Sequence, residues 1–182
     1  MICVLSGTNR TGSTTSKVAH AAAIKLRELG REVEVIDLKE IPLSLYHPTA
    51  YEQRPSEFAP YQDIILKASG LLIVTPEYNG SFPGVLKTFI DMLEFPKSLK
   101  GLVVGFVGVA AGHFGALRSV EQLSAIVQYR SAHLFGERLF MHGAGALDVQ
   151  GSQLGHAEYQ ERFDSLLLNF CHHVQAVKGG KP

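Results

Sequence analysis

The stretch that decides the fold is residues 71–93, LLIVTPEYNGSFPGVLKTFIDML. Its first five residues form a continuous apolar run that includes β-branched side chains, which is typical of a parallel strand buried on both faces. Pro76 and Pro83 restrict φ at the two ends of the following loop, and a helix is expected from Val85. The stretch therefore predicts a strand, a stiff loop and a helix in an α/β protein.

The rest of the chain repeats this alternation. Further apolar runs lie at residues 2–5, 33–36, 102–109 and 132–140, and helical patterns lie at 14–29, 61–69, 116–129 and 157–177. Strands that alternate with helices indicate a doubly wound parallel sheet. We expect a flavodoxin-like three-layer sandwich whose five-stranded parallel sheet has the order 2-1-3-4-5. In that order the loops after strands 1, 3 and 4 converge at the carboxyl edge of the sheet.

Length and composition predict one domain. The chain has 182 residues, of which 46% are hydrophobic and 19% charged, as in an ordinary globular protein. We expect a single domain over residues 1–178 and a disordered tail at 179–182. Residues 38–60 contain Pro42, Pro48, Pro55 and Pro60, which predict a long surface excursion with at most one short turn, able to cap a pocket.

Several classes of partner are disfavoured. A formal net charge of +0 without a basic block argues against nucleic acid. No signal peptide and no stretch long enough to cross a membrane are evident, so a cytoplasmic location without membrane contact is expected. Cys3 and Cys171 lie outside any Cys-x-x-Cys pattern and are interpreted as buried thiols, and no metal site is predicted.

The loop after the first strand has the composition of a phosphate site. Hydroxyl side chains and one arginine precede a helix whose N-terminus carries a partial positive charge: Thr8, Arg10, Ser13, Thr14, Thr15 and Ser16. The loop is neither a Walker A motif nor a Gly-x-Gly-x-x-Gly fingerprint. The alternative is that the hydroxyls only cap the helix, but one hydroxyl suffices for capping, so the cluster favours phosphate.

The loops after strands 3 and 4 complete the predicted site. Glu77, Tyr78 and Asn79 place a carboxylate, a phenol and an amide beyond the third strand, where ligands bind in open α/β sheets. Glu77 is interpreted as a hydrogen-bond acceptor or a charge at a helix N-terminus rather than a general base. His113 lies in the third loop, either in contact with nicotinamide or substrate or as an ordinary exposed residue.

Two motifs carry a family resemblance. Residues 7–19, GTNRTGSTTSKVA, and residues 75–93, TPEYNGSFPGVLKTFIDML, resemble the NAD(P)H-dependent FMN reductases, which include bacterial quinone, azo and chromate reductases. The resemblance implies non-covalent FMN and assembly into dimers or tetramers, with the helix after residue 84 at a dimer interface. Gly80 stands where relatives often carry a larger residue, which implies a more open pocket over the flavin.

The resemblance also implies roles for particular residues. The FMN phosphate would be held by Thr8, Arg10, Ser13 and Thr15. The isoalloxazine and ribityl groups would be contacted by Pro76, Glu77, Tyr78 and Asn79. The other side of the ring would be bordered by the loop with Gly108, Ala111 and Gly112.

The expected function is an NAD(P)H-dependent oxidoreductase of the FMN reductase or quinone reductase type. Hydride would pass from NADPH or NADH to FMN and on to a small acceptor such as a quinone, azo compound, free flavin or metal oxyanion. Because the cofactor carries the hydride chemistry, no catalytic acid, base or nucleophile is expected from the protein. The alternatives are a flavodoxin-like electron carrier, which the zero net charge disfavours, and a flavin-binding regulator without turnover.

Overall fold

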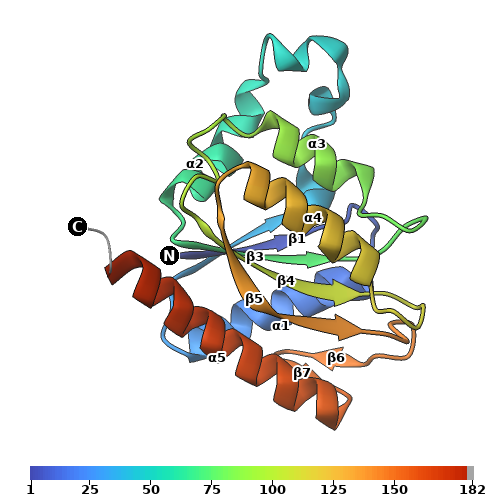
Figure 1. The fold of residues 1–182 in the computed structure, drawn as a ribbon. Coiled ribbons are helices and arrows are strands. Elements are labelled where there is room, and N and C mark those ends of the chain that lie inside the picture. The colour runs from blue at the N-terminus through green and yellow to red at the C-terminus, as the bar shows by residue number, and fades with distance from the viewer. Residues whose placement is uncertain (180–182) are drawn as a thin grey trace.

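The protein, described here by a computed structural model over residues 1–179, is built on one five-stranded parallel sheet (Figure 1). The strands follow the order β2-β1-β3-β4-β5, and every neighbouring pair is parallel. Their bounds are β1 Ile2–Ser6, β2 Val33–Asp37, β3 Gly70–Thr75, β4 Val103–Val109 and β5 His133–Met141. The predicted flavodoxin-like fold and strand order are confirmed.

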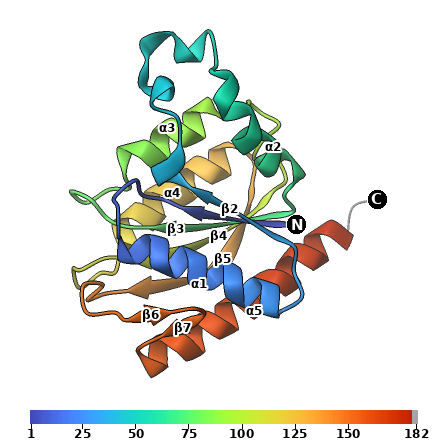
Figure 2. The same cartoon turned by 180° about the vertical axis from the view of Figure 1, so that it is seen from behind.

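Helices cover both faces of the sheet, as the two opposite views show (Figures 1 and 2). Side chains of α1 and α5 pack in one apolar layer with the sheet, and side chains of α2, α3 and α4 pack in the other. The helices are α1 Thr14–Glu28, α2 Ala59–Lys67, α3 Gly84–Met92, α4 Leu117–Tyr129 and α5 Ala157–Gly179. The arrangement is a three-layer sandwich.

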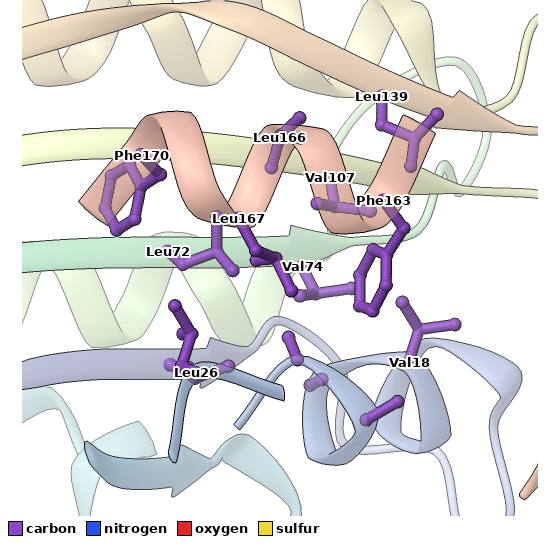
Figure 3. Close-up of a cluster of buried hydrophobic side chains, with 14 of the residues drawn as sticks. Val18, Leu26, Leu72, Val74, Val107, Leu139, Phe163, Leu166, Leu167 and Phe170 are labelled. Atoms are coloured by element: carbon purple, nitrogen blue, oxygen red, sulfur yellow. The ribbon is translucent and has the colours of Figure 1, made fainter. Parts of the chain in front are cut away.

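The central strand β3 shows why its sequence is apolar throughout. Leu72 and Val74 belong to the layer under α1 and α5, whereas Leu71 and Ile73 belong to the layer under α2, α3 and α4. Successive side chains of a strand point to opposite faces, so a strand covered on both sides needs no polar positions. Figure 3 shows the first layer, where the predicted inward residues of α5, among them Phe163 and Leu167, meet α1 and the sheet.

Phe170 of α5 fits against two glycines of the sheet. A Cβ atom added to Gly105 would lie 3.0 Å from the Phe170 ring, and one added to Gly70 would lie 3.1 Å from the ring and 2.7 Å from Val174 Cγ2. The ring is fully buried. The absence of side chains at these two sheet positions therefore sets how closely α5 approaches β3 and β4.

The ends of the helices follow local chemistry. Gly30, with φ of 75°, ends α1 as predicted, because its N–H and that of Arg31 bond back to the carbonyls of Arg27 and Leu26. Helix α2 begins at Ala59, two residues before the predicted start. Pro60 lies in its first turn, where a proline removes no intrahelical hydrogen bond.

The predicted excursion at residues 38–60 contains more structure than the single turn expected. Four short 3-10 helices occupy Leu38–Glu40, Leu43–Tyr46, Pro48–Tyr51 and Ser56–Phe58. Buried apolar side chains anchor them to the α2 and α3 layer: Leu38, Ile41, Leu45, Ala50 and Phe58. Prolines exclude long helices but not single 3-10 turns, which is why the sequence pattern missed them.

Three further features complete the description. The Gly-rich stretch after β5 contains an unpredicted antiparallel pair, β6 Val149–Gln150 and β7 Gln153–Leu154. Helix α5 extends through Gly179, and the remainder of the expected disordered tail, residues 180–182, lies outside the described residues. Among residues 1–179, no helix combines the length and apolarity needed to cross a membrane.

Both cysteines are free and buried, as predicted. Burial raises the pKa of the Cys3 thiol well above its usual range, and it raises the pKa of Cys171 despite the opposing charge of Arg31. A thiol that stays protonated is a poor nucleophile, so the two side chains act as core residues.

Candidate cofactor-binding site

The parallel register brings the loops after β1, β3, β4 and β5 to one edge of the sheet. Ser6 pairs with Val74, Thr75 with Gly108, and Val109 with Met141. A cavity of about 260 Å³ opens there, lined by Arg10, Thr14, Thr15, Pro76, Glu77, Tyr78, Val109, Ala110, Ala111, Ala144 and Gly145. This is the carboxyl edge at which open α/β sheets bind ligands.

The first loop places positive charge at one end of the cavity. Ser13 caps α1, with its Oγ accepting the Ser16 N–H at 3.1 Å. The other N–H groups of the first turn are donors that a helix leaves without intrahelical partners. Arg10 is exposed beside them and lines the cavity. A helix N-terminus next to a free guanidinium suits a phosphate group.

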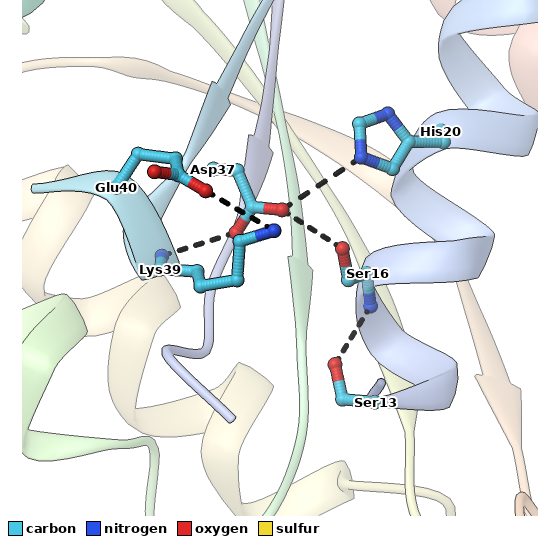
Figure 4. Close-up of polar contacts among 6 residues, drawn as sticks. All are labelled: Ser13, Ser16, His20, Asp37, Lys39 and Glu40. Carbon is cyan, nitrogen blue, oxygen red and sulfur yellow. Dashed lines mark hydrogen bonds and ion pairs between the residues drawn. The ribbon is translucent and has the colours of Figure 1, made fainter. Parts of the chain in front are cut away.

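Two predicted phosphate ligands of this loop have other contacts. Ser16 donates its hydroxyl hydrogen to Asp37 Oδ2 at 2.9 Å, and Asp37 also accepts the Lys39 N–H and lies 3.7 Å from His20 Nε2 (Figure 4). Thr8 is buried, and its Oγ1 accepts the Arg10 N–H at 3.2 Å. Neither residue lines the cavity, and neither does Ser13. The hydrogen bonds of these three side chains stabilise the conformation of the loop.

The second loop is a tight turn rather than an irregular one. Tyr78 and Ser81 exchange two backbone hydrogen bonds, of 2.8 and 3.1 Å, around Asn79 and Gly80. Both central residues have positive φ, 53° and 76°, as an Asn-Gly hairpin turn requires. The Tyr78 hydroxyl and Thr8 Oγ1 share a hydrogen bond of 2.8 Å, so the first and second loops are joined.

Glu77 binds the start of helix α4. Its Oε2 accepts the Arg118 N–H at 3.1 Å, and its Oε1 accepts from Arg118 Nη1 at 2.9 Å. The carboxylate thus serves as a charge at a helix N-terminus, one of the two roles expected for it. A second cavity of about 240 Å³ adjoins the first, and Glu77, Ala110 and Ala111 line both.

Of the remaining predicted residues, three line the second cavity and one lines neither cavity. Asn79, Gly112 and His113 line the second cavity, whereas Gly108 lies on β4 and lines neither. Residues 38–60 line neither cavity, so within one chain the excursion does not form the cap that was expected. Among residues 1–179, no group of three or more His, Cys, Asp or Glu side chains is placed to hold a metal ion.

The sequence interpretation missed the loop after β5. Ala144 and Gly145 close the first cavity, the Ala144 N–H bonds Ala110 O at 3.2 Å, and Thr14 donates its hydroxyl hydrogen to Ala144 O at 2.9 Å. The run Gly143–Gly145 directly after the fifth strand was the available signal, because the carboxyl end of that strand lies at the same edge as the others.

The sheet order defines a flavodoxin-like fold. The N-terminus of α1, Arg10 and the small residues of the cavity wall suit a phosphorylated, flat cofactor. The chain belongs to the NADPH-dependent FMN reductase family, whose family model matches residues 1–146. The expected family and enzyme class, with FMN as cofactor and NAD(P)H as reductant, are confirmed.

Individual relatives agree with this assignment. An NAD(P)H-dependent FMN reductase of Pseudomonas aeruginosa is 33% identical over 155 residues, covering 82% of each chain. A 2-hydroxy-1,4-benzoquinone reductase of a Burkholderia species is 31% identical, covering 83% of this chain and 84% of the relative. Among solved structures, the Paracoccus denitrificans flavoenzyme FerB, an NAD(P)H:(acceptor) oxidoreductase, has a TM-score of 0.78 at 20% identity over 96% of this chain and 97% of its own. The last comparison supports the fold.

Proposed function

We propose that the protein, as one FMN-binding domain over residues 1–178, oxidises NAD(P)H through bound FMN and reduces a small acceptor such as a quinone. The observation that carries this proposal is the cavity between the Arg10 loop and the Tyr78 turn, at the carboxyl edge of a sheet of the family's fold. When bound, FMN supplies the hydride chemistry. The relatives named as an FMN reductase and a benzoquinone reductase support this class of acceptor.

The chain's own residues would bind and orient the cofactor. The phosphate would be held by Arg10 and by the first turn of α1, which includes Thr15. The conformation of this loop is stabilised by hydrogen bonds of Thr8, Ser13 and Ser16. The ring and ribityl chain would contact Pro76, Tyr78 and Ala111 in the first cavity. They would also lie beside Asn79 and Gly112, where the second cavity adjoins the first. No step requires a protein acid or base, since proton uptake by a reduced quinone can come from water.

An anaerobic absorbance experiment tests this function. The purified protein is mixed with FMN and then with NADPH or NADH, and a quinone is added last. We expect the bound flavin absorbance to bleach with either nicotinamide and to return with the quinone. Bound flavin that neither nicotinamide reduces would indicate an electron carrier or a regulator, and absence of flavin binding would overturn the site.

His113 provides a prediction for this site. It lines the second cavity and its ring contacts those of Phe114 and His142, at centroid distances of 5.6 and 5.8 Å. Because it does not line the first cavity, His113→Ala is expected to change the FMN dissociation constant less than about twofold. Fluorescence titration of apoprotein with FMN measures this. Loss of flavin from the variant would show that the third loop has another role.

We also infer a homo-oligomer, either a dimer or a tetramer, assembled through α3 and α4. A groove of about 560 Å³ lies between these helices, and its lining includes Ile90, Ile126 and Tyr129. Phe95 and Tyr129 are 64% and 79% exposed, with ring centroids 6.5 Å apart. Large aromatic side chains exposed together favour burial against a partner, and a second copy of the chain is the partner proposed here.

The oligomer has its own test. Tyr129→Lys is expected to shift the wild-type oligomer to a monomer in size-exclusion chromatography with light scattering, because it removes an exposed aromatic ring and adds a positive charge to a groove that already contains Lys87 and Arg130. Leu168→Lys, on α5 and 42% exposed, is the control and should leave the mass unchanged. A monomeric wild-type protein at micromolar concentration would contradict the proposal.

A reducing, cytoplasmic location is inferred as well, consistent with the two free thiols.

A further inference from the structure

The second cavity adjoins the proposed cofactor site, and its lining includes Asn79 and Gly112, which the function proposed above places beside the cofactor. It shares Glu77, Ala110 and Ala111 with the first cavity, and its lining also includes Gly80, Phe114 and Arg118. A ligand that extends from the first cavity into the second can therefore contact these residues. The second cavity, at about 240 Å³, has room for a substituent or a single ring.

The Arg118 side chain contacts Glu77 and the Phe114 ring. Its Nη1 donates to Glu77 Oε1 at 2.9 Å, and its guanidinium carbon lies 4.9 Å from the centroid of the Phe114 ring. Its aliphatic part passes near Gly80, where an added Cβ atom would lie 3.9 Å from Arg118 Cδ, an ordinary contact distance. A planar guanidinium fixed by an ion pair and an aromatic face loses little freedom when it binds a further anion.

Within this ion pair the arginine is much more exposed than the glutamate. The Arg118 side chain is 54% exposed and that of Glu77 is 14% exposed. Glu77 also accepts the Arg118 backbone N–H, which directs its charge toward the start of α4. Among the residues that line the second cavity, Glu77 is the one carboxylate. Of the five N–H donors of an arginine, the structure assigns one to Glu77, and the others can reach a ligand oxygen.

We propose that Arg118 forms an anion subsite for the electron acceptor, so that the enzyme prefers aromatic acceptors carrying a sulfonate, a carboxylate or an ionised hydroxyl group. The acceptor ring would lie beside the cofactor in the first cavity, with its anionic oxygen atoms on the guanidinium in the second. This inference rests on the proposed oxidoreductase function. It adds to that function a class of acceptor and the residue that selects it.

Paired quinones test the subsite in the FMN-loaded protein. The acceptors are 1,4-naphthoquinone-2-sulfonate and uncharged 1,4-naphthoquinone, each taking two electrons and one proton as hydride from NAD(P)H and a second proton from water. Arg118→Gln is expected to raise the KM for the sulfonate about 5- to 20-fold, the range for losing one partly exposed charged hydrogen bond. The kcat, the KM for the neutral quinone and the KM for NADPH and NADH should change less than twofold.

Two further variants separate charge from local packing. Arg118→Lys keeps a cation beside Glu77 but loses the planar fork, and should recover part of the sulfonate preference. Arg138→Gln is the matched control: Arg138 also pairs with a carboxylate, Glu121, and lies 6.0 Å from the ring centroid of Phe140, yet it lines a different groove. This control should leave the ratio of the two KM values unchanged.

A binding measurement keeps the inference separate from turnover. Naphthalene-2-sulfonate cannot be reduced by NAD(P)H, and calorimetry should show that wild-type holoprotein binds it about 5- to 20-fold more tightly than Arg118→Gln does, with an affinity that falls as salt rises. If wild type binds the sulfonate but oxidises no NAD(P)H, the proposed function fails and the subsite stands. Equal losses for both quinones, a similar loss in Arg138→Gln, or a raised KM for NADPH alone would overturn the subsite.

Discussion

Replacing Gly108 by alanine is expected to lower the free energy of unfolding by about 1–3 kcal/mol, the usual cost of overpacking a closed site. The added Cβ would lie 2.4 Å from the Gly115 carbonyl oxygen, 3.0 Å from Phe140 Cδ1 and 3.2 Å from Ala116 Cβ. A backbone oxygen cannot rotate away as a side chain can. The loop between β4 and α4 must therefore move, and Ala110 and Ala111, which line both cavities, lie in it.

Urea denaturation of the apoprotein measures this change, and FMN titration measures its effect on the cavity. The control is Gly136→Ala, since Gly136 lies on the adjacent strand β5 with no atom within 4 Å of the added Cβ. Its stability should equal or slightly exceed that of the wild type. Equal urea midpoints for Gly108→Ala and Gly136→Ala would show that the loop after β4 is not fixed against the sheet as described.

Replacing Arg10 by alanine is expected to weaken FMN binding about 10- to 100-fold, which corresponds to losing one hydrogen bond to a charged group, roughly 1.5–3 kcal/mol. Arg10 is exposed, lines the first cavity and is the residue proposed to bind the phosphate. At saturating FMN, turnover of the variant should be close to wild type, because the proposed role of Arg10 is to bind the phosphate and not to contact the reacting ring.

Riboflavin makes the test of Arg10 specific, because it lacks the phosphate. Fluorescence titrations should show a large loss for FMN and less than a twofold loss for riboflavin. Arg162→Ala provides the control, since Arg162 lies on α5 beside Glu158, 3.7 Å away, and lines neither of the two cavities. Equal weakening of FMN and riboflavin would remove Arg10 from the phosphate site.

The fold was predictable because its signals are local and repeated. Buried parallel strands read as apolar runs, and the topology rules for parallel sheets then leave few orders. The same reasoning placed the loops after β1, β3 and β4 together. The role of Gly30 at the end of α1 could also be predicted, since few other residues adopt its positive φ.

The orientation of side chains could not be predicted in the same way. Ser16 turns to Asp37 and Glu77 turns to Arg118, which follow 21 and 41 residues later in the chain. Such partners are set by tertiary packing, and the hydroxyl and carboxylate patterns are identical whether they face a ligand or a neighbouring helix. The contribution of Ala144 to the cavity was hidden for a related reason, because a small residue carries no chemical signature.

Phe170 and the two glycines beneath it have a consequence for how sequences of this kind diverge. A methyl group at Gly105 would lie 3.0 Å from the ring, and one at Gly70 would lie 3.1 Å from the ring and 2.7 Å from Val174 Cγ2, so the neighbouring side chains would have to shift. Shortening Phe170 alone would leave a cavity that costs about 3–5 kcal/mol. Each single step is thus disfavoured, and a larger residue at one glycine together with a smaller residue at position 170 is expected to cost less than the sum of the two single changes, so the three positions are expected to show epistasis and to covary among homologues.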